Sequence, residues 1–419
     1  MALMTAWIKN CLLALALALA WSTPVAAATF SMKRGINLDI WVAWPDEARW
    51  NEPDVLLPFP EWRQHIDRAD LEALKQYGFD FVRMPVDPSP FLSAKTEGFR
   101  DRLFASVLDS VRMINKAGLK AVVDLHLFPA GGNRSIGMTE VMDDPAMFER
   151  YVELVRKMAG LLAKEDPQKV AFEPMNEPVV DCDDSGTNLW SERQQKLFAA
   201  ARASATKLTL VLTGGCYSGA EALEKINPRD YPDDNIIWTF HSYAPFLLTH
   251  QGATWTGDFI QHVTGLPYPP HAAPPAELDR ALDVIRDKIR ADASWSRRDG
   301  MLAYLDEQIA TMDTEEKLDA LESEPFRLVE AWAQKHEVSA SEIYLGEFGM
   351  IRQEYGNDYI LPAASRAAYV KDMIARAENR GYAWSVWSYG GAFGVVEAFG
   401  GEKAEPDVLE VIKGLGNGE

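Results

Sequence analysis

The sequence predicts an α/β protein, a (β/α)8 TIM barrel with an enlarged helical insertion between its sixth and seventh strands. Three observations predict it: short apolar runs recur along the chain, amphipathic helical stretches separate them, and polar residues follow the ends of the runs. Such alternation indicates βαβ units around a parallel sheet. Eight units favour a closed barrel over a doubly wound sheet, because no Gly-rich phosphate fingerprint follows the first run.

The eight predicted strands are the apolar runs themselves, each with the length of a strand. In chain order they are GINLDI (35–40), FDFVRMP (79–85), LKAVVDLH (119–126), KVAFEPMN (169–176), KLTLVLTG (207–214), NIIWTFHS (235–242), EIYLGEF (342–348) and YAWSVWS (382–388).

The predicted helices lie between these runs. The stretches DRADLEALKQYG and RLFASVLDSVRMINKAG each end at a glycine that can cap a helix. Residues 243–340 exceed a regular unit, since a Pro-rich loop is followed there by charged helical sequence. We expect a lengthened sixth loop and two or three helices, packed beside the barrel or partly over its mouth. A separate small domain is the alternative, although no flexible Gly/Ser linker marks a boundary.

The N-terminal segment predicts export. Lys9 precedes the apolar run CLLALALALAW, and small residues follow in STPVAAATF. This pattern is typical of a cleaved secretory signal, here residues 1–27, with the cut after Ala27 or Ala28. An uncleaved anchor is the alternative. We therefore expect a single catalytic domain over residues 28–419, located in a periplasm or outside the cell.

The net charge limits the partners that the protein is expected to bind. The formal net charge of −20 disfavours binding to nucleic acid or anionic membranes.

Cys182 and Cys216 each lie a few residues beyond a predicted strand, on the same face of a barrel. In an oxidising compartment they can form a disulfide, and two unpaired thiols are the alternative.

Polar side chains stand at the C-terminal ends of the predicted strands, where barrel enzymes collect their active sites. Glu177 and Glu347, from the fourth and seventh strands, would face each other across the barrel mouth. Cleavage of a glycosidic bond requires such a pair, one carboxyl protonated and one ionised. A separation of about 5 Å predicts retention of configuration, and roughly 6.5–9.5 Å predicts inversion. The other candidates are Arg83, His126, Asn176, His241, Tyr243 and Trp387.

These motifs resemble those of glycoside hydrolase family 5. The resemblance rests on NEP at the fourth strand and GEFG at the seventh, with the arginine, histidines, tyrosine and tryptophan in this order, and it spans nearly the whole chain after the signal. It implies a retaining (β/α)8 glycosidase. Carried onto this sequence, it implies that Glu177 is the acid/base and Glu347 the nucleophile.

The carboxylate pair needs supporting groups. Partial burial and a second nearby carboxylate should raise the pKa of Glu177, so that it holds a proton near neutral pH. Arg83 and Tyr243 could keep Glu347 ionised through hydrogen bonds. Glu173 and Asp124 lie within their strand runs and are expected to be buried, hydrogen-bonded carboxylates.

The remaining candidates would contact the sugar. Asn176 is suited to the sugar 2-hydroxyl, an interaction that strengthens in the transition state. Trp387 offers a flat apolar face, and His126 and His241 can hydrogen-bond hydroxyls or orient the carboxylates. Asp39, at the end of the first strand, is a candidate for a distal sugar subsite.

Tryptophans in the loops predict an extended substrate. Trp41, Trp44, Trp50, Trp190 and Trp255 lie in loops after the predicted strands. Exposed tryptophans near a barrel mouth stack on sugar rings, although part of this set is expected to pack the loops. A polysaccharide groove is therefore favoured over a pocket for one sugar.

We predict a retaining glycosidase that cleaves a β-linked polysaccharide by double displacement, with β-1,4-glucan as the first candidate. Hydrolysis or transglycosylation of a specialised bacterial exopolysaccharide is an alternative, and a non-enzymatic carbohydrate-binding barrel is another. The sequence contains no HExxH, P-loop, GxSxG or EF-hand motif, so neither a metal nor a cofactor is expected. The expected partner is a polysaccharide or oligosaccharide, and the expected state is a monomer.

Overall fold

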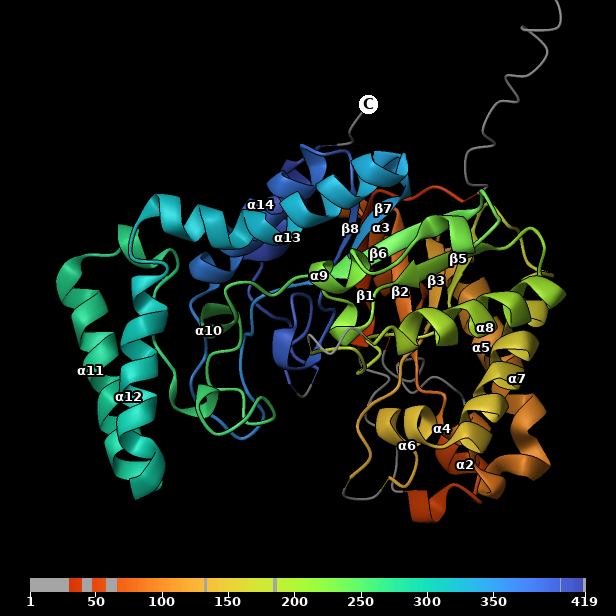
Figure 1. Cartoon of the computed structure of the whole chain (residues 1–419), viewed down its shortest axis with the longest axis horizontal. Coiled ribbons are helices and arrows are strands. Elements are labelled where there is room, and N and C mark those ends of the chain that lie inside the picture. The colour runs from red at the N-terminus through yellow and green to blue at the C-terminus, as the bar shows by residue number, and fades with distance from the viewer. Residues whose placement is uncertain are drawn as a thin grey trace, which may run out of the picture.

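Eight parallel strands close into a barrel in chain order, β1 to β8 (Figure 1). The computed structural model describes residues 30–39, 47–57, 66–131, 134–183, 187–399 and 401–416, so the predicted signal peptide lies outside the described residues. Each predicted run overlaps one strand. The strands are β1 (Arg34–Asn37), β2 (Phe81–Val86), β3 (Lys120–Leu125), β4 (Val170–Glu173), β5 (Thr209–Thr213), β6 (Ile236–His241), β7 (Ile343–Phe348) and β8 (Ala383–Val386).

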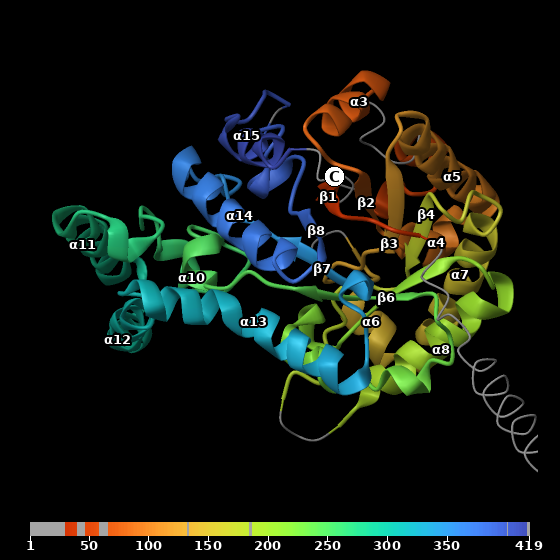
Figure 2. The ribbon, with the colours of Figure 1, turned by 90° about the horizontal axis from the view of Figure 1, so that it is seen from above.

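Helices surround the barrel (Figure 2). Helices α3 and α5 each end shortly before a glycine, as predicted. These glycines, Gly78 and Gly118, have φ of 101° and 84°, a conformation that glycine adopts without steric cost. The helices are α2 (Pro53–Leu56), α3 (Arg68–Gln76), α4 (Ser89–Leu92), α5 (Arg100–Lys116), α6 (Met138–Asp143), α7 (Pro145–Leu162), α8 (Leu189–Ser204), α9 (Ala220–Leu223), α10 (Phe246–Thr249), α11 (Pro275–Asp292), α12 (Trp295–Ala310), α13 (Glu315–His336), α14 (Ala363–Glu378) and α15 (Asp407–Gly414).

An apolar layer fills the barrel interior near the N-terminal ends of the strands. Phe81 and Tyr344 meet edge to face, with ring centroids 5.7 Å apart. The other members of this inner cluster are Phe30, Val122, Ala171, Val211, Ile237 and Ala383. Side chains alternate along a strand, so residues two positions further on also point inward. From Phe81, Val122 and Ala171 that step leads to Arg83, Asp124 and Glu173, which places a charged layer directly above the apolar one.

The insertion between β6 and β7 contains the short helix α10 and the three longer helices α11, α12 and α13. Of the three longer helices, α13 packs on the barrel, where its Phe326 and Trp332 meet Phe240 and Trp238 of β6 edge to face. Helices α11 and α12 lie side by side and project away from the barrel, at the end of the molecule opposite α5 and α7 (Figure 2).

Within the described ranges, no helix is both long enough and apolar enough to cross a membrane.

Candidate active site

Arg83 organises the charged layer inside the barrel. Its side chain is fully buried, and it holds Glu173 with two parallel hydrogen bonds of 2.8 and 2.9 Å. Its Nη2 also lies 2.9 Å from the Asp124 carboxylate. Glu173 and Asp124 are therefore the buried, paired carboxylates that their positions in the strands predict. A buried arginine with its donors occupied fixes the strands β2, β3 and β4 relative to one another.

The same guanidinium reaches Glu347. Arg83 Nη1 donates to Glu347 Oε1 at 2.7 Å, and the Tyr243 hydroxyl donates to Oε2 at 2.9 Å. Both partners are the ones expected for this carboxylate. Burial raises the pKa of Glu347 above its ordinary value, the nearby Glu177 adds to that rise, and the positive charge of Arg83 opposes it. The charge of Glu347 thus depends on these neighbours.

A local irregularity turns Glu347 into the barrel. Strict alternation from Tyr344 would place Gly346 inward and Glu347 outward. The pairing of β7 shifts register between Leu345 and Phe348, and a shift of this kind re-aims a side chain. Gly346 makes room for it, because a Cβ there would lie 2.5 Å from Thr239 Oγ1 and 2.8 Å from His241 Nε2.

Glu177 leaves the end of β4 in an uncommon backbone conformation. Its φ is +39°, which is costly for a residue with a side chain and recurs at functional sites. Its side chain is 28% exposed, the most accessible of the acidic groups in this cluster. Burial raises the pKa of Glu177 to about 7, with the nearby Glu173 adding to the rise and His126 and Arg83 opposing it. Glu177 can therefore hold a proton near neutral pH, as expected.

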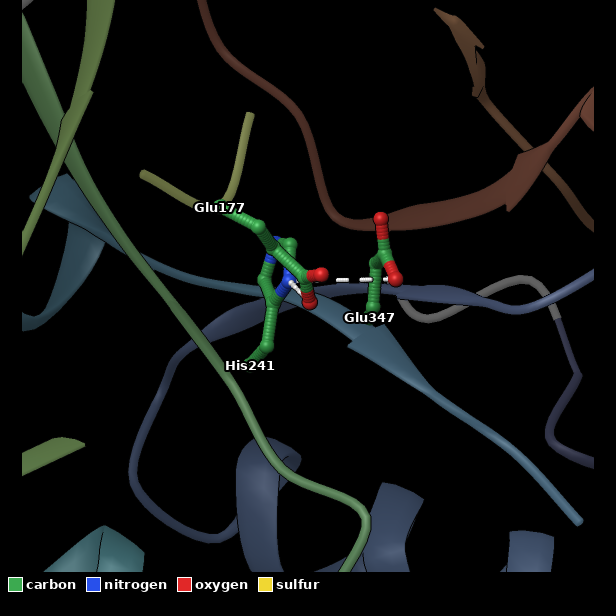
Figure 3. A group of neighbouring side chains, drawn as sticks. All are labelled: Glu177, His241 and Glu347. Carbon is green, nitrogen blue, oxygen red and sulfur yellow. Dashed lines mark hydrogen bonds and ion pairs between the residues drawn. The ribbon is translucent and has the colours of Figure 1, made fainter. Parts of the chain in front are cut away.

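His241 lies beside Glu177 and contacts both glutamates (Figure 3). Its Nδ1 is 2.8 Å from Glu177 Oε1 and 3.7 Å from Glu347 Oε2. Burial lowers the pKa of His241 to about 4, so the ring is neutral at neutral pH. One ligand atom from each of the three side chains lies within 4.8 Å of the others. This spacing of the carboxylates matches the pair of a retaining glycosidase and is too small for an inverting one.

Asn176 is oriented by two neighbours. Arg83 Nη2 can only donate, so the Asn176 oxygen that it contacts at 2.7 Å is the acceptor. The Asn176 amide nitrogen then donates to His126 Nε2 at 3.1 Å, which puts the His126 proton on Nδ1, facing Asp124 at 2.8 Å. One amide hydrogen of Asn176 is left over for a ligand.

The same triad, Glu177, His241 and Glu347, is the one group in the described part of the chain whose side chains could hold a metal ion. An ion there would compete with the hydrogen bonds from Arg83 and Tyr243 to Glu347. The donor set suits proton transfer and nucleophilic attack better than a resident metal.

The chain matches the family model described as Cellulase (glycosyl hydrolase family 5) over residues 51–393. It belongs to glycosyl hydrolase family 5. The protein is therefore a glycoside hydrolase of the retaining class.

Relatives of this family 5 enzyme include Endoglucanase C of Acetivibrio thermocellus, 24% identical over 86% of this chain and 91% of that protein. Two solved structures share its fold. Cellulose synthase subunit Z of Clostridioides difficile has a TM-score of 0.62 at 24% identity and covers 91% of this chain and 99% of its own. Cel5A of Thermotoga maritima, solved with cellobiose, has a TM-score of 0.61 at 22% identity and covers 91% and 97%.

Trp387 borders the site of this family 5 hydrolase. Its ring stacks on His126 at a centroid distance of 5.6 Å, and His126 in turn stacks on Phe128 at 4.7 Å. Trp387 is partly exposed, so it can present an apolar surface to a sugar.

Asp39 does not have the position expected of a distal subsite. Its side chain is buried, and its carboxylate accepts a hydrogen bond from Gly390 N at 2.9 Å. Burial raises its pKa to about 7. The carboxylate braces the loop after β8, beside Trp387, because its backbone partner lies there.

The five tryptophans that were predicted to lie in loops differ in exposure. Trp50 and Trp190 are buried, so these two belong to the part of the set that was expected to pack against the protein, and Trp190 lies in α8 and not in a loop. Trp190 donates from its indole nitrogen to the Thr213 carbonyl at 2.8 Å. Trp255 is 55% exposed, as a binding residue requires. Trp41 and Trp44 lie outside the described residues.

A disulfide joins Cys182 and Cys216, whose Cα atoms are 4.7 Å apart. It ties the loop that follows Glu177 to the loop after β5. Cys216 N also donates to the Val180 carbonyl at 2.9 Å. The segment that follows Glu177 is thus held to the loop after β5 by a covalent bond and a hydrogen bond.

Sequence reasoning missed two residues of the site. Asn37 accepts from Arg83 Nη1 at 3.0 Å, and its inward position follows from the two-residue alternation of β1. His250 packs edge to face on Tyr243, with ring centroids 5.0 Å apart. No pattern in the sequence signals His250, because it lies in the irregular sixth loop.

Proposed function

We propose that the protein is an exported hydrolase that cleaves internal bonds of β-1,4-linked glucan by double displacement. The observation that carries the proposal is the pair Glu177 and Glu347, with oxygens within 4.8 Å of each other, in a chain of family 5. The name of its relative Endoglucanase C supports the choice of glucan and of internal cleavage.

In the first step Glu347 attacks the anomeric carbon of the sugar. A bond forms between its oxygen and that carbon, the glycosidic bond breaks, and Glu177 gives its proton to the departing oxygen. In the second step water attacks the glycosyl-enzyme, Glu177 takes a proton from the water, and Glu347 is released. Configuration is retained because the carbon is inverted twice.

His241 directs the proton of Glu177. A neutral His241 with its hydrogen on Nδ1 donates to Glu177 Oε1, which leaves the proton of Glu177 on Oε2. Once Glu347 is esterified its negative charge is gone, so a charged Glu177 no longer faces a like charge and its pKa falls. The same residue can then act as the base.

Asn176 and Trp387 bind the sugar that reacts. The amide hydrogen that Asn176 does not give to His126 is available to the 2-hydroxyl, and this bond strengthens as positive charge develops at the anomeric carbon. The ring of Trp387 stacks on the apolar face of the sugar.

Two observations support export. The pattern of residues 1–27 is typical of a secretory signal, and a disulfide such as Cys182–Cys216 persists in an oxidising compartment.

A second candidate substrate is a polysaccharide that a bacterium makes itself. The likeness in fold to a cellulose synthase subunit favours it. In this case the enzyme would trim or transfer chains during their secretion, and transfer would appear as products longer than the substrate.

The test is release of reducing ends by the purified protein from carboxymethyl cellulose, mixed-linkage glucan, β-1,3-glucan, mannan, xylan and bacterial exopolysaccharides, with Glu347→Gln as the control. We expect activity on β-1,4-glucan that is absent in the variant, and NMR of the first product should show retained configuration. Activity on a different polymer alone would make that polymer the proposed substrate in place of β-1,4-glucan. Binding without turnover by the unmodified protein would favour a carbohydrate-binding barrel.

A further inference from the structure

A hollow of about 380 Å³ lies on α12, outside the catalytic centre. Its lining consists of Phe259, Ser296, Arg297, Gly300, Met301 and Tyr304. Arg297, Gly300, Met301 and Tyr304 recur at helical spacing and so share one face of α12. Helix α12 lies at the end of the molecule away from α5 and α7 (Figure 2), and no step of the mechanism uses it.

The hollow has an aromatic wall that is held in place. Tyr304 is 46% exposed, and its ring meets Phe259 edge to face with centroids 4.9 Å apart. Gly300 lies one helical turn before Tyr304, and a Cβ at Gly300 would meet no atom within 4 Å. The missing side chain leaves one side of the Tyr304 ring open.

A polar pair stands at the edge of the hollow. Arg297 Nη2 and Asp258 Oδ1 are 2.9 Å apart, and both side chains are more than half exposed. This pair holds the loop before Phe259 against α12. A guanidinium has five N–H donors and a carboxylate about four acceptor positions, so one shared bond leaves several for the hydroxyls of a ligand.

We propose that this hollow is a second binding site for the polysaccharide, remote from the cleavage site. A sugar ring has an apolar face that packs on an aromatic ring and an edge of hydroxyls that charged pairs can bind. The volume falls in the range of pockets for small ligands, about 300–1,000 Å³, which suits one or two sugar units better than a protein surface. The inference rests on the proposed function for its choice of ligand.

The loop beside the hollow connects it to the barrel mouth. This loop carries the exposed Trp255, and Thr254 N donates to Glu354 Oε2 at 3.1 Å. Glu354 follows Glu347 in the loop after β7. A long chain bound at the mouth could therefore be held a second time at the hollow, whereas a short oligosaccharide could not. The site would favour long substrates.

The test fills the hollow. Gly300→Leu puts a side chain into the open space and should stabilise α12, since glycine is a poor helix former. Gly414→Leu is the matched control, because Gly414 is also helical and a Cβ there also meets no atom within 4 Å. Tyr304→Ala removes the aromatic wall instead. All three are made in the Glu347→Gln background, and their binding to soluble cellulose derivatives is measured by affinity electrophoresis.

We expect Gly300→Leu and Tyr304→Ala to bind the polymer roughly three- to tenfold more weakly than Gly414→Leu. With Glu347 restored, the same two variants should show a lower ratio of activity on polymer to activity on an aryl cellobioside. Equal binding by Gly300→Leu and Gly414→Leu would overturn this inference and leave the proposed function intact. Self-association that Gly300→Leu abolishes, without a change in polymer binding, would assign the hollow to a second copy of the chain. If the unmodified protein neither binds nor cleaves any glucan, the proposed function fails and this inference with it.

Discussion

Glu177 and Glu347 differ in their surroundings more than in their chemistry. Glu347 is enclosed by Arg83 and Tyr243, whereas Glu177 accepts a hydrogen bond from the neutral His241 and remains partly exposed. A proton donor must reach the departing oxygen, and a nucleophile must be held rigidly. The two environments therefore suit the roles proposed above, Glu177 as the acid/base and Glu347 as the nucleophile.

Replacing Glu177 with Gln should slow cleavage according to the leaving group. On a polysaccharide, loss of the general acid should lower kcat/KM by about 10²- to 10⁴-fold. On a dinitrophenyl cellobioside, whose leaving group needs no proton, the first step should be nearly as fast as in the unmodified enzyme. Steady-state and burst kinetics on both substrates measure this. Equal loss on both would contradict the acid role of Glu177.

Gly346 is required by close packing. In Gly346→Ala the new Cβ would lie 2.5 Å from Thr239 Oγ1 and 2.8 Å from His241 Nε2, so the His241 ring must shift and its contact with Glu177 is disturbed. Since misplacement of a catalytic group by about 1 Å can cost a hundredfold in rate, we expect a drop of that order in kcat/KM. Gly98→Ala is the control, because a Cβ there meets nothing within 4 Å. Full activity of Gly346→Ala would show that His241 does not position Glu177.

At the scale of elements, the side chain of Arg83 joins four strands, β2, β3, β4 and β7. Replacing Arg83 with Met would leave Glu173, Asp124 and Glu347 buried without their cation. Removing one partner of a buried pair typically costs about 3–5 kcal/mol, and we expect a loss of that size in the free energy of unfolding. Urea denaturation followed by tryptophan fluorescence measures it.

Arg290→Met tests whether the loss at Arg83 is specific. Arg290 pairs with Asp287 on the surface, where both side chains are more than half exposed. Exposed pairs contribute little, so the urea midpoint should not change. Comparable losses in the two variants would show that the charged layer does not hold the strands together.

The disulfide is a second link between elements. It closes a loop of 34 residues, for which the chain-entropy model gives about 4 kcal/mol of stabilisation. We expect the double variant Cys182→Ser, Cys216→Ser to melt at a lower temperature and to lose activity, because the loop after Glu177 is released. Dithiothreitol should lower the Tm of the unmodified protein and leave the Tm of the double variant unchanged. A Tm that neither change affects would mean that the bridge does not form.

The sequence reveals elements better than the contacts between them. Short apolar runs are a local signal, so all eight strands could be located before the structure was known. Glu177 and Glu347 could be paired because strands of a barrel end at the same rim. The inward turn of Glu347 at the register shift and the bond from Arg83 to Asn37 depend on closure of the barrel, which no local pattern encodes.

Burial in loops was the hardest property to predict. Trp50 and Trp190 were both expected in loops, but Trp190 lies at the start of α8, and packing against distant segments makes both of them core residues. Asp39 was placed at the correct rim, but its bond to Gly390 lies 351 residues away in sequence.

For the whole molecule, several buried carboxyl groups hold protons that the unfolded chain would lose. Tyr268 lies within hydrogen-bonding distance of two carboxylates, Glu322 at 2.6 Å and Asp372 at 2.9 Å. Its hydroxyl has one hydrogen, so one of the two must carry a proton to satisfy both contacts. Burial raises the pKa of Glu322 to about 7, as it does for Glu177 and Asp39, although Arg376 Nη2 lies 2.9 Å from Glu322 and opposes the rise, so we expect Glu322 to be the proton carrier.

This excess of protons in the folded state sets the direction of the pH dependence. Groups with a folded pKa near 7 and an unfolded pKa near 4 bind more protons when folded, so stability falls as pH rises between those values. Buried His241 and His250 have pKa values lowered to about 4 and about 3, so they act in the opposite direction below their unfolded pKa of about 6.5. We therefore expect the Tm to decrease from pH 6.5 to pH 8, and Glu322→Gln, which keeps a neutral side chain at every pH, to flatten part of that slope. Differential scanning calorimetry across this range measures both. A Tm that rises toward pH 8 in the unmodified protein would show that these carboxyl groups are ionised in the fold, with Tyr268 bonded to only one of them.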